Sequence, residues 1–173
     1  MNPISLTLKN TKILKNTAGP EDVALGSSSL LSILSSNESL QIAVQESQFT
    51  GNAAGNGLIR ILKSGQVKRT IENSTFIENY ASDNGTIFCL EKSLEGTANS
   101  LAMTGNTFVE NHCEGNGGVM YLFEILGQVS SVENVFLNNS AGVNGGIGFI
   151  MAGNLTYYDE KSLYSGKFGV VGL

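Results

Sequence analysis

A short motif recurs four times in this chain at nearly constant spacing. In each copy a phenylalanine is followed three residues later by an asparagine, and an Asn-Gly step comes four or five residues after that asparagine. The phenylalanines lie 27, 32 and 28 residues apart and are Phe49, Phe76, Phe108 and Phe136. Such a period is typical of solenoids, in which each repeat stacks only on its neighbours. Weaker copies begin at Ile13 and Tyr164, so we expect about six stacked units.

Alignment of the copies on the Asn-Gly step places apolar residues in the same columns. Two columns hold only apolar residues, aromatic residues and cysteine: Ile59, Ile87, Val119 and Ile147 in one, and Ile61, Cys89, Tyr121 and Phe149 in the other. The column between them admits Arg60 and Gly148. This alternation is typical of a strand with one face in a core and the other toward solvent.

Each repeat has room for three short strands. One strand precedes the phenylalanine, at residues 40–44, 67–71, 101–103 and 129–132. The Phe-x-x-Asn segment forms a second strand, and the residues after Asn-Gly form a third. Three strands and three bends per repeat describe one rung of a parallel β-helix, whose strands pair with their equivalents at roughly 4.8 Å. An antiparallel sandwich is the alternative, but it does not require matched residue types at matched offsets.

The best-preserved copies span residues 108–119 and 136–147, and both keep Phe-x-x-Asn followed by Gly-Gly and an aliphatic residue. Over roughly residues 45–151 this pattern resembles the repeat of chlamydial polymorphic outer-membrane proteins, which also occurs in other β-helix surface proteins. The resemblance implies an exposed location and right-handed winding. We therefore predict an all-β, right-handed parallel β-helix of about six rungs, formed as a single domain by residues 1–173. The resemblance implies no ligand, because this repeat is shared by proteins of different function.

The asparagine and glycine columns are interpreted as corners rather than as a binding motif. Both residue types tolerate the left-handed backbone conformations that tight corners require. Asparagine amides stacked along the axis can hydrogen-bond to one another, and stacked phenylalanine rings can fill the core beside them. The predicted asparagine ladders comprise Asn52, Asn79, Asn111 and Asn139 in one column, and Asn56, Asn84, Asn116 and Asn144 in the other.

Composition limits the possible partners. The chain has a net charge of −5 and a sequence isoelectric point of about 4.8, and its nearest approach to a basic cluster is Lys63, Lys68 and Arg69. Nucleic acid is therefore not an expected partner. Only 14% of residues are charged, which favours a secreted or cell-surface protein. No stretch reaches the length of a membrane span, and the first residues do not read as a secretory signal, so we expect a mature segment or a fragment.

Five Asn-x-Ser/Thr sequons are candidates for N-glycosylation in a secreted chain: Asn37, Asn73, Asn84, Asn138 and Asn154. Asn84 ranks last because it belongs to a corner column and is expected to be committed to the ladder.

The two cysteines and the single histidine give only a weak signal of chemistry. Cys89 and Cys113 fall at different offsets from the preceding phenylalanine, so we expect two free thiols, with Cys89 in a core column. Cys113 follows His112, which could indicate a nucleophile or a metal ligand. Adjacent residues of a strand point to opposite faces, however, and Ala81 and Ala141 occupy the position of Cys113 in neighbouring repeats. A structural role is therefore favoured, and no metal or cofactor is expected.

Many right-handed β-helix proteins cleave acidic polysaccharides, so a lyase or hydrolase is one alternative function. The aspartates and arginines are scattered over different repeats: Asp22, Asp83, Asp159, Arg60 and Arg69. Glu78 and Glu110 share one offset and could lie roughly 5 Å apart, as a carboxylate pair or a weak calcium site. Ladder neighbours give that spacing automatically, and no basic partner accompanies the pair. No catalytic residue is therefore predicted.

The two ends of the predicted solenoid carry apolar, strand-like sequence without an evident cap, at residues 4–8 and 168–173. We expect either further rungs or self-association through these ends. The favoured function is a non-catalytic extracellular structural protein that stacks end to end into a fibre. The alternative is the passenger region of a surface adhesin, which presents loops at residues 19–37 and 92–100 to a glycan or a receptor. Residues 27–36 could form another strand or pack over the side of the solenoid.

Overall fold

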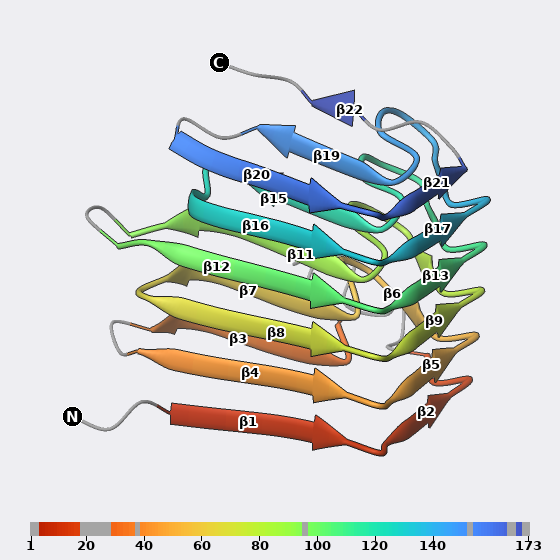
Figure 1. The fold of residues 1–173 in the computed structure, drawn as a ribbon, viewed down its shortest axis with the longest axis horizontal. Helices are drawn as coiled ribbons and strands as arrows, with labels where there is room; N and C mark the ends of the chain where they lie inside the picture. The colour runs from red at the N-terminus through yellow and green to blue at the C-terminus, as the bar shows by residue number, and fades with distance from the viewer. Residues whose placement is uncertain are drawn as a thin grey trace.

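The computed structural model describes residues 4–17, 29–36, 39–94, 97–151, 154–165 and 169–170. Every regular element within these ranges is a β-strand, and all the strand pairs are parallel. The strands wind into a β-solenoid whose four sheets extend along the stacking direction, from β1 near the N-terminus to β22 near the C-terminus (Figure 1). The predicted all-β parallel solenoid is confirmed.

Strand lengths differ between the four sheets. The first sheet contains β1 (Ile4–Lys9), β4 (Leu40–Gln45), β8 (Val67–Glu72), β12 (Asn99–Thr104), β16 (Leu126–Val132) and β20 (Asn154–Glu160). The second contains β2 (Lys12–Leu14), β5 (Gln48–Thr50), β9 (Thr75–Ile77), β13 (Thr107–Val109), β17 (Val135–Leu137) and β21 (Leu163–Ser165). The third contains β6 (Ala53–Ala54), β10 (Tyr80–Ala81), β14 (His112–Cys113) and β18 (Ser140–Ala141). The fourth contains β3 (Leu31–Ser36), β7 (Ile59–Ser64), β11 (Phe88–Ser93), β15 (Met120–Phe123), β19 (Gly148–Met151) and β22 (Gly169–Val170).

Four turns, which begin at β4, β8, β12 and β16, have a strand in every sheet. The expected count of about six rungs included an incomplete set of strands at each end, and the expected three strands per rung omitted the third sheet. Strands of two residues are too short to produce a recognisable periodicity. The first-sheet strands run left to right in the foreground of Figure 1 and the fourth-sheet strands run back behind them as the chain rises, so the winding is right-handed.

The core lies between the sheets and is filled by alternate residues of each strand. In β4 and β8 the residues at the first, third and fifth positions are buried. The phenylalanine in each of the four middle strands of the second sheet points inward, and neighbouring rings stack with centroids 4.9, 4.9 and 4.8 Å apart from Phe49 to Phe136. Burial of each ring stabilises the fold by about 1.5–3 kcal/mol, and stacking adds roughly 0.5–1.5 kcal/mol per pair. The ring column therefore holds the turns in register.

Between the second and third sheets, the asparagine of the Phe-x-x-Asn motif forms a hydrogen-bonded ladder. Asn52 Nδ2 donates to Asn79 Oδ1 at 3.0 Å, and the next two links, through Asn111 to Asn139, are both 2.9 Å long. Each Oδ1 also accepts a backbone N–H from the turn before. The ladder satisfies polar groups at a corner where strand pairing is interrupted.

A second ladder, which the sequence analysis missed, lies between the first and second sheets. There the backbone N–H of one turn donates to a side-chain oxygen of the next turn. The residues of this column are Thr11, Ser47, Ser74, Asn106, Asn134 and Ser162. Serine and asparagine alternate irregularly here, so the column does not stand out as a repeated letter.

One predicted register in the fourth sheet is wrong. Arg60 pairs with Cys89 rather than with Phe88, because the loop from the Asn-Gly step to the fourth-sheet strand is one residue longer after Asn84 than after Asn56. Phe88 and Leu90 belong to the core, so Cys89 lies on the opposite face of the strand. Cys89, Tyr121 and Phe149 do share one column, but with Arg60 rather than Ile61 and on the face opposite the main core cluster. The expected burial of Cys89 is confirmed, since Cys89 and Phe149 expose 0% and 6% of their surface.

The two expected loops are also corrected. Within residues 19–37, Leu31–Ser36 forms strand β3, which answers the open question about residues 27–36, while residues 18–28 and 37–38 lie outside the described ranges. Of residues 92–100, the first two belong to β11 and the last two to β12, so the connection between these strands spans only residues 94–98.

Candidate functional site

The N-terminal end face of the solenoid consists of β1, β2 and β3, which are the terminal strands of the first, second and fourth sheets. Among the described strands, β1 pairs only with β4 and β2 pairs only with β5. The inward positions of β1 and β2 are occupied by Ile4, Leu6, Leu8 and Ile13, in register with the core residues of the turn above. Ile4 keeps 54% of its surface exposed. This face is thus an apolar surface bordered by unpaired strand edges.

The C-terminal end face is formed by β20, β21 and β22; of the predicted apolar end at residues 168–173, only 169–170 (β22) lie within the described ranges. Of the four positions equivalent to Ile4, Leu6, Leu8 and Ile13, the first holds the apolar Leu155 and the other three carry polar groups. Tyr164 stacks on Phe136 with ring centroids 5.0 Å apart, and its hydroxyl lies 3.0 Å from that of Tyr157. Burial raises the pKa of the Tyr157 phenol above its usual value, and the hydrogen bond with Tyr164 raises it further. Asp159 follows on the same face of β20 as Tyr157. The two end faces therefore differ in polarity.

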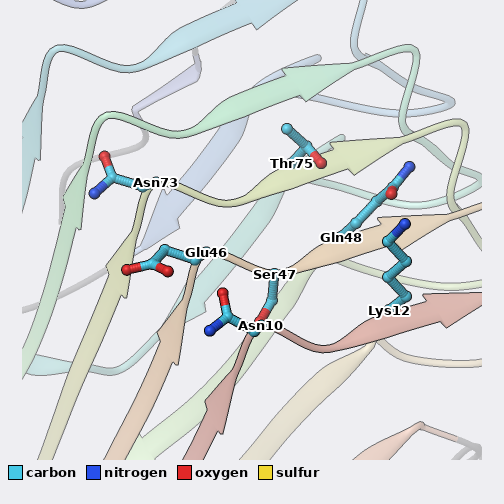
Figure 2. A pocket seen from close by; sticks show the side chains of 7 residues that line it. All are labelled: Asn10, Lys12, Glu46, Ser47, Gln48, Asn73 and Thr75. Carbon is cyan, nitrogen blue, oxygen red and sulfur yellow. The ribbon is translucent and has the colours of Figure 1, made fainter.

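A groove of about 390 Å³ runs beside the corner between the first and second sheets (Figure 2). One side carries the corner residues Asn10, Glu46 and Asn73, the other side carries Lys12, Gln48 and Thr75 of the second-sheet strands, and Ser47 lies between them. Amides, hydroxyls and both signs of charge are thus presented together. Such a lining can form hydrogen bonds with a neutral polar ligand such as a sugar.

The only histidine lies in an exposed polar cluster on the third sheet. His112 Nδ1 is 2.8 Å from Ser140 Oγ, and its Nε2 is 3.8 Å from Glu114 Oε1, which also accepts a 3.0 Å hydrogen bond from the Tyr80 hydroxyl. The side chains of His112 and Glu114 are 41% and 58% exposed. A serine, a histidine and a glutamate are the residue types of a hydrolytic triad. In a site this exposed, water screens the charges, so these side chains would stabilise a transition state far less than the same groups in a closed site.

Cys89 and Cys113 are both buried, and neither forms a disulfide, which confirms the expectation of two free thiols. Burial raises the pKa of the Cys113 thiol to about 11, and burial followed by the Glu91 carboxylate raises that of Cys89. Cys113 pairs in register with Ala81 and Ala141, as predicted. Thiols with raised pKa values are poor nucleophiles at neutral pH.

The remaining predicted ionisable residues do not converge on one place. Glu78 and Glu110 are exposed at the same corner of successive turns, and Arg60 pairs with Glu91 at 3.7 Å on the fourth sheet. Asp83 lies after β10, and Asp22 lies outside the described residues. Within the described ranges, no group of three or more histidine, cysteine, aspartate or glutamate side chains could hold a metal ion.

Arg69, which the sequence predicts as part of a weak basic cluster and as one of two scattered arginines, is buried. It takes an inward position in β8 and is 2% exposed, and burial lowers its pKa to about 9. Its Nη2 lies 3.5 Å from Asn99 Oδ1, while its Nε has no hydrogen-bond partner among the described residues. The alternation in β8 places position 69 inward, so its burial could have been predicted from the strand pattern.

The sequons differ in accessibility. Asn73, Asn138 and Asn154 are exposed, the first two at corners with φ of 49° and 53°. Asn84 is half-buried, and its Oδ1 accepts hydrogen bonds from the backbone and side chain of Asn116. Asn37 lies outside the described residues. The predicted ladder of the Asn-Gly step, Asn56, Asn84, Asn116 and Asn144, forms in part. Asn116 donates to Asn84, and Asn144 donates to Asn116 at 3.0 Å. Asn56 instead lies 4.0 Å from the Cys89 sulfur.

Comparison of the chain with known protein families, curated proteins and solved structures found no match in any of the three. The resemblance to the chlamydial repeat therefore rests on the residues quoted for it and stays a prediction. In the part of the chain that the structure describes, no helix is long and apolar enough to cross a membrane.

Proposed function

We propose that this chain is a non-catalytic extracellular structural protein whose solenoid stacks end to end with further copies into a fibre. The observation that carries the proposal is the N-terminal end face, where inward apolar residues and unpaired strand edges lie in register with the turns above them. Burial of apolar surface and parallel strand pairing are the interactions that already join the turns of the solenoid. A second copy offers both.

The side-chain ladder between the first and second sheets supports one defined register in which that copy would stack. Ser47 Oγ and Ser74 Oγ donate to the carbonyl two residues before them while each accepts the backbone N–H of the preceding turn. Thr11 Oγ1 donates to the Lys9 carbonyl in the same way, at 3.1 Å. It is thus oriented to accept an N–H from a turn below, which in a stack would belong to Ser162 of another copy.

An extracellular location is part of the same proposal. It is supported by the low proportion of charged residues, 14%, by the resemblance to surface-protein repeats, and by the exposure of Asn73, Asn138 and Asn154. Glycans at these positions would project from the sides of the solenoid. Intact mass of material from a eukaryotic secretion host measures their occupancy, and we expect Asn84 to remain unmodified.

Electron microscopy and sedimentation velocity test the fibre. We expect evenly repeating filaments that shorten on dilution, and replacement of Ile4 by Arg should abolish them because a charge would enter the apolar end face. The matched control is Val143→Arg, which adds the same charge at a side position that is 64% exposed. Monodisperse short rods of the unmodified chain at high protein concentration would overturn the proposal.

The groove beside the first corner favours a second candidate function, adhesion to a surface glycan. Its polar lining fits a neutral oligosaccharide, and it lies on the side of the solenoid, where stacking leaves it accessible. Titration calorimetry against a panel of neutral oligosaccharides should detect binding, and Gln48→Ala should weaken it by about tenfold, the effect of roughly one lost hydrogen bond. Equal heats for the chain and for Gln48→Ala would remove this candidate.

A further inference from the structure

One inward column of the first sheet ends in a carboxylate. Parallel pairing places six residues in this column, in the order Leu8, Val44, Ile71, Met103, Ser131 and Asp159. The second to fifth of them are at most 1% exposed. Asp159 is exposed because its column stops at the C-terminal end face. Any turn that covered this face would bury it.

Continuation of the observed pairing by one turn defines how a second copy would sit on β20. Its β1 would place Leu6 opposite Tyr157, Leu8 opposite Asp159, and Lys9 opposite Glu160. Its β2 would place Ile13 opposite Tyr164, which repeats the contact that Ile13 makes with Phe49. Three of these four pairs are favourable: two bury apolar surface, and Lys9 with Glu160 joins opposite charges.

We propose that copies join C-terminal face to N-terminal face in this register, and that protonation of Asp159 controls the joining. The proposal rests on the fibre function and adds its register and its regulation. The partner is a second copy of this chain, because Lys9 of one copy complements Glu160 of the other and Thr11 continues the serine and asparagine ladder.

The groups around Asp159 explain why ionisation opposes joining. Within its own copy the same inward face presents the Tyr157 phenol and the Ser131 hydroxyl, and the charged neighbours Glu160 and Lys161 follow it in sequence. From the second copy, the side chain opposite is that of Leu8, while Lys9 is outward and faces Glu160. An ionised Asp159 would thus be buried without a cation at an inward position, which is costly.

The tyrosines of the end face do not impose the same cost. The hydroxyls of Tyr157 and Tyr164 already contact each other at 3.0 Å, and Ser131 also hydrogen-bonds to Tyr157, so each phenol oxygen keeps at least one partner when the rings are covered. Asp159 is therefore the inward group on this face whose charge state determines the cost of covering the face. Burial in the joint disfavours its charged form, so joining is strongest when Asp159 is protonated and weakens as the pH rises.

The test measures the critical concentration for filament formation by sedimentation and light scattering, at pH 7.5 and at pH 5.5. Both values lie above the sequence isoelectric point of about 4.8, so isoelectric precipitation is avoided. We expect the unmodified chain to assemble more readily at pH 5.5. Asp159→Asn should lower the critical concentration at pH 7.5 by about 10- to 100-fold, because it removes the charge that the joint would bury, and should abolish the pH dependence.

Two further variants separate this effect from net charge and from folding. Glu110→Gln removes the same charge at an exposed corner and should leave assembly unchanged. Exchange of the paired charges, Lys9→Glu with Glu160→Lys, should restore the assembly that either single change weakens. Circular dichroism of the monomers checks that each variant is folded.

The outcomes distinguish the two proposals. Filaments of the same critical concentration for the unmodified chain and for Asp159→Asn at both pH values would overturn the control by Asp159 and leave the fibre standing. Failure of the charge exchange to restore assembly would overturn the register. Absence of filaments for both chains at every pH and concentration would overturn the fibre, and this inference with it.

Discussion

At two corners of the solenoid, side chains form hydrogen bonds with backbone groups where strand pairing is interrupted, but the two corners use different residues. Between the second and third sheets every complete turn uses asparagine, whereas serine and asparagine share the corner between the first and second sheets. Asn111 donates to Asn139 Oδ1 and to the Phe76 carbonyl and accepts two hydrogen bonds from Asn79, so it links three turns. The Ser74 side chain links only two turns, because its hydroxyl accepts the Ser47 N–H and donates to the Glu72 carbonyl of its own turn.

The comparison shows what makes a repeat column invariant. A side chain that must reach both the next asparagine and a carbonyl of the preceding turn needs an amide, which has donors and an acceptor on one short stem. A corner that needs only one acceptor for a backbone N–H tolerates serine, threonine or asparagine. Where asparagine occupies the mixed corner, as at Asn106, its amide also donates to a carbonyl of the preceding turn and to the next asparagine. In the invariant column Asn52, Asn79 and Asn111 all make both bonds, so invariance there is explained by structure without a ligand.

The largest expected effect is that of Asn111→Ala. The variant leaves the Phe76 carbonyl, the backbone N–H and amide of Asn79, and Asn139 Oδ1 without this partner in a buried corner. We expect a loss of about 3–5 kcal/mol in the free energy of unfolding, since each buried unsatisfied group costs roughly 1–3 kcal/mol. Urea denaturation followed by circular dichroism measures this loss. Asn144→Ala, at an exposed end of the other asparagine column, is the matched control and should cost under about 1 kcal/mol.

A smaller effect is expected for Ser74→Ala. The variant removes the acceptor for the Ser47 N–H and the donor to the Glu72 carbonyl. The same denaturation experiment should give a loss of about 1–2 kcal/mol. A loss equal to that of Asn111→Ala would show that the two corners carry equal energy, contrary to the comparison.

The smallest effect is expected for Ser74→Asn, which converts the mixed corner toward the uniform one. Asparagine already occupies the equivalent position at Asn106 and Asn134, so its side chain fits this corner and supplies the required acceptor. The free energy of unfolding should stay within about 1 kcal/mol of that of the unmodified chain. Destabilisation as large as that of Ser74→Ala would mean that the mixed corner discriminates by size.

The fold was predictable because its main columns repeat the same residue types. The phenylalanines of the second sheet and the asparagines beside them each occupy one fixed offset, so counting residues recovers their alignment. The alignment failed at Arg60 and Cys89, where a one-residue difference in loop length shifts the register and exchanges the two faces of the strand. The third sheet was not predicted, because its strands are only two residues long and are too short to show a periodic pattern.

The candidate sites were less predictable, because each depends on which turns meet. The groove joins residues of three turns, and the polar cluster of Tyr80, His112, Glu114 and Ser140 also spans three turns. No local motif marks either one. The end faces were predicted as apolar edges, yet Asp159 and the tyrosine pair became visible only when pairing assigned them to inward columns.

The hydrogen bonds of the sheets, and most of those in both ladders, join one turn to its neighbours along the stacking direction. A pulling force applied along the stacking direction would therefore load the interfaces between turns in series, so that each one bears the whole force. The tensile strength of the rod would equal that of its weakest interface, however many turns are added. A force applied across the rod would instead be carried by the covalent backbone of each turn, so the protein should be mechanically strong around its circumference and weaker along its length.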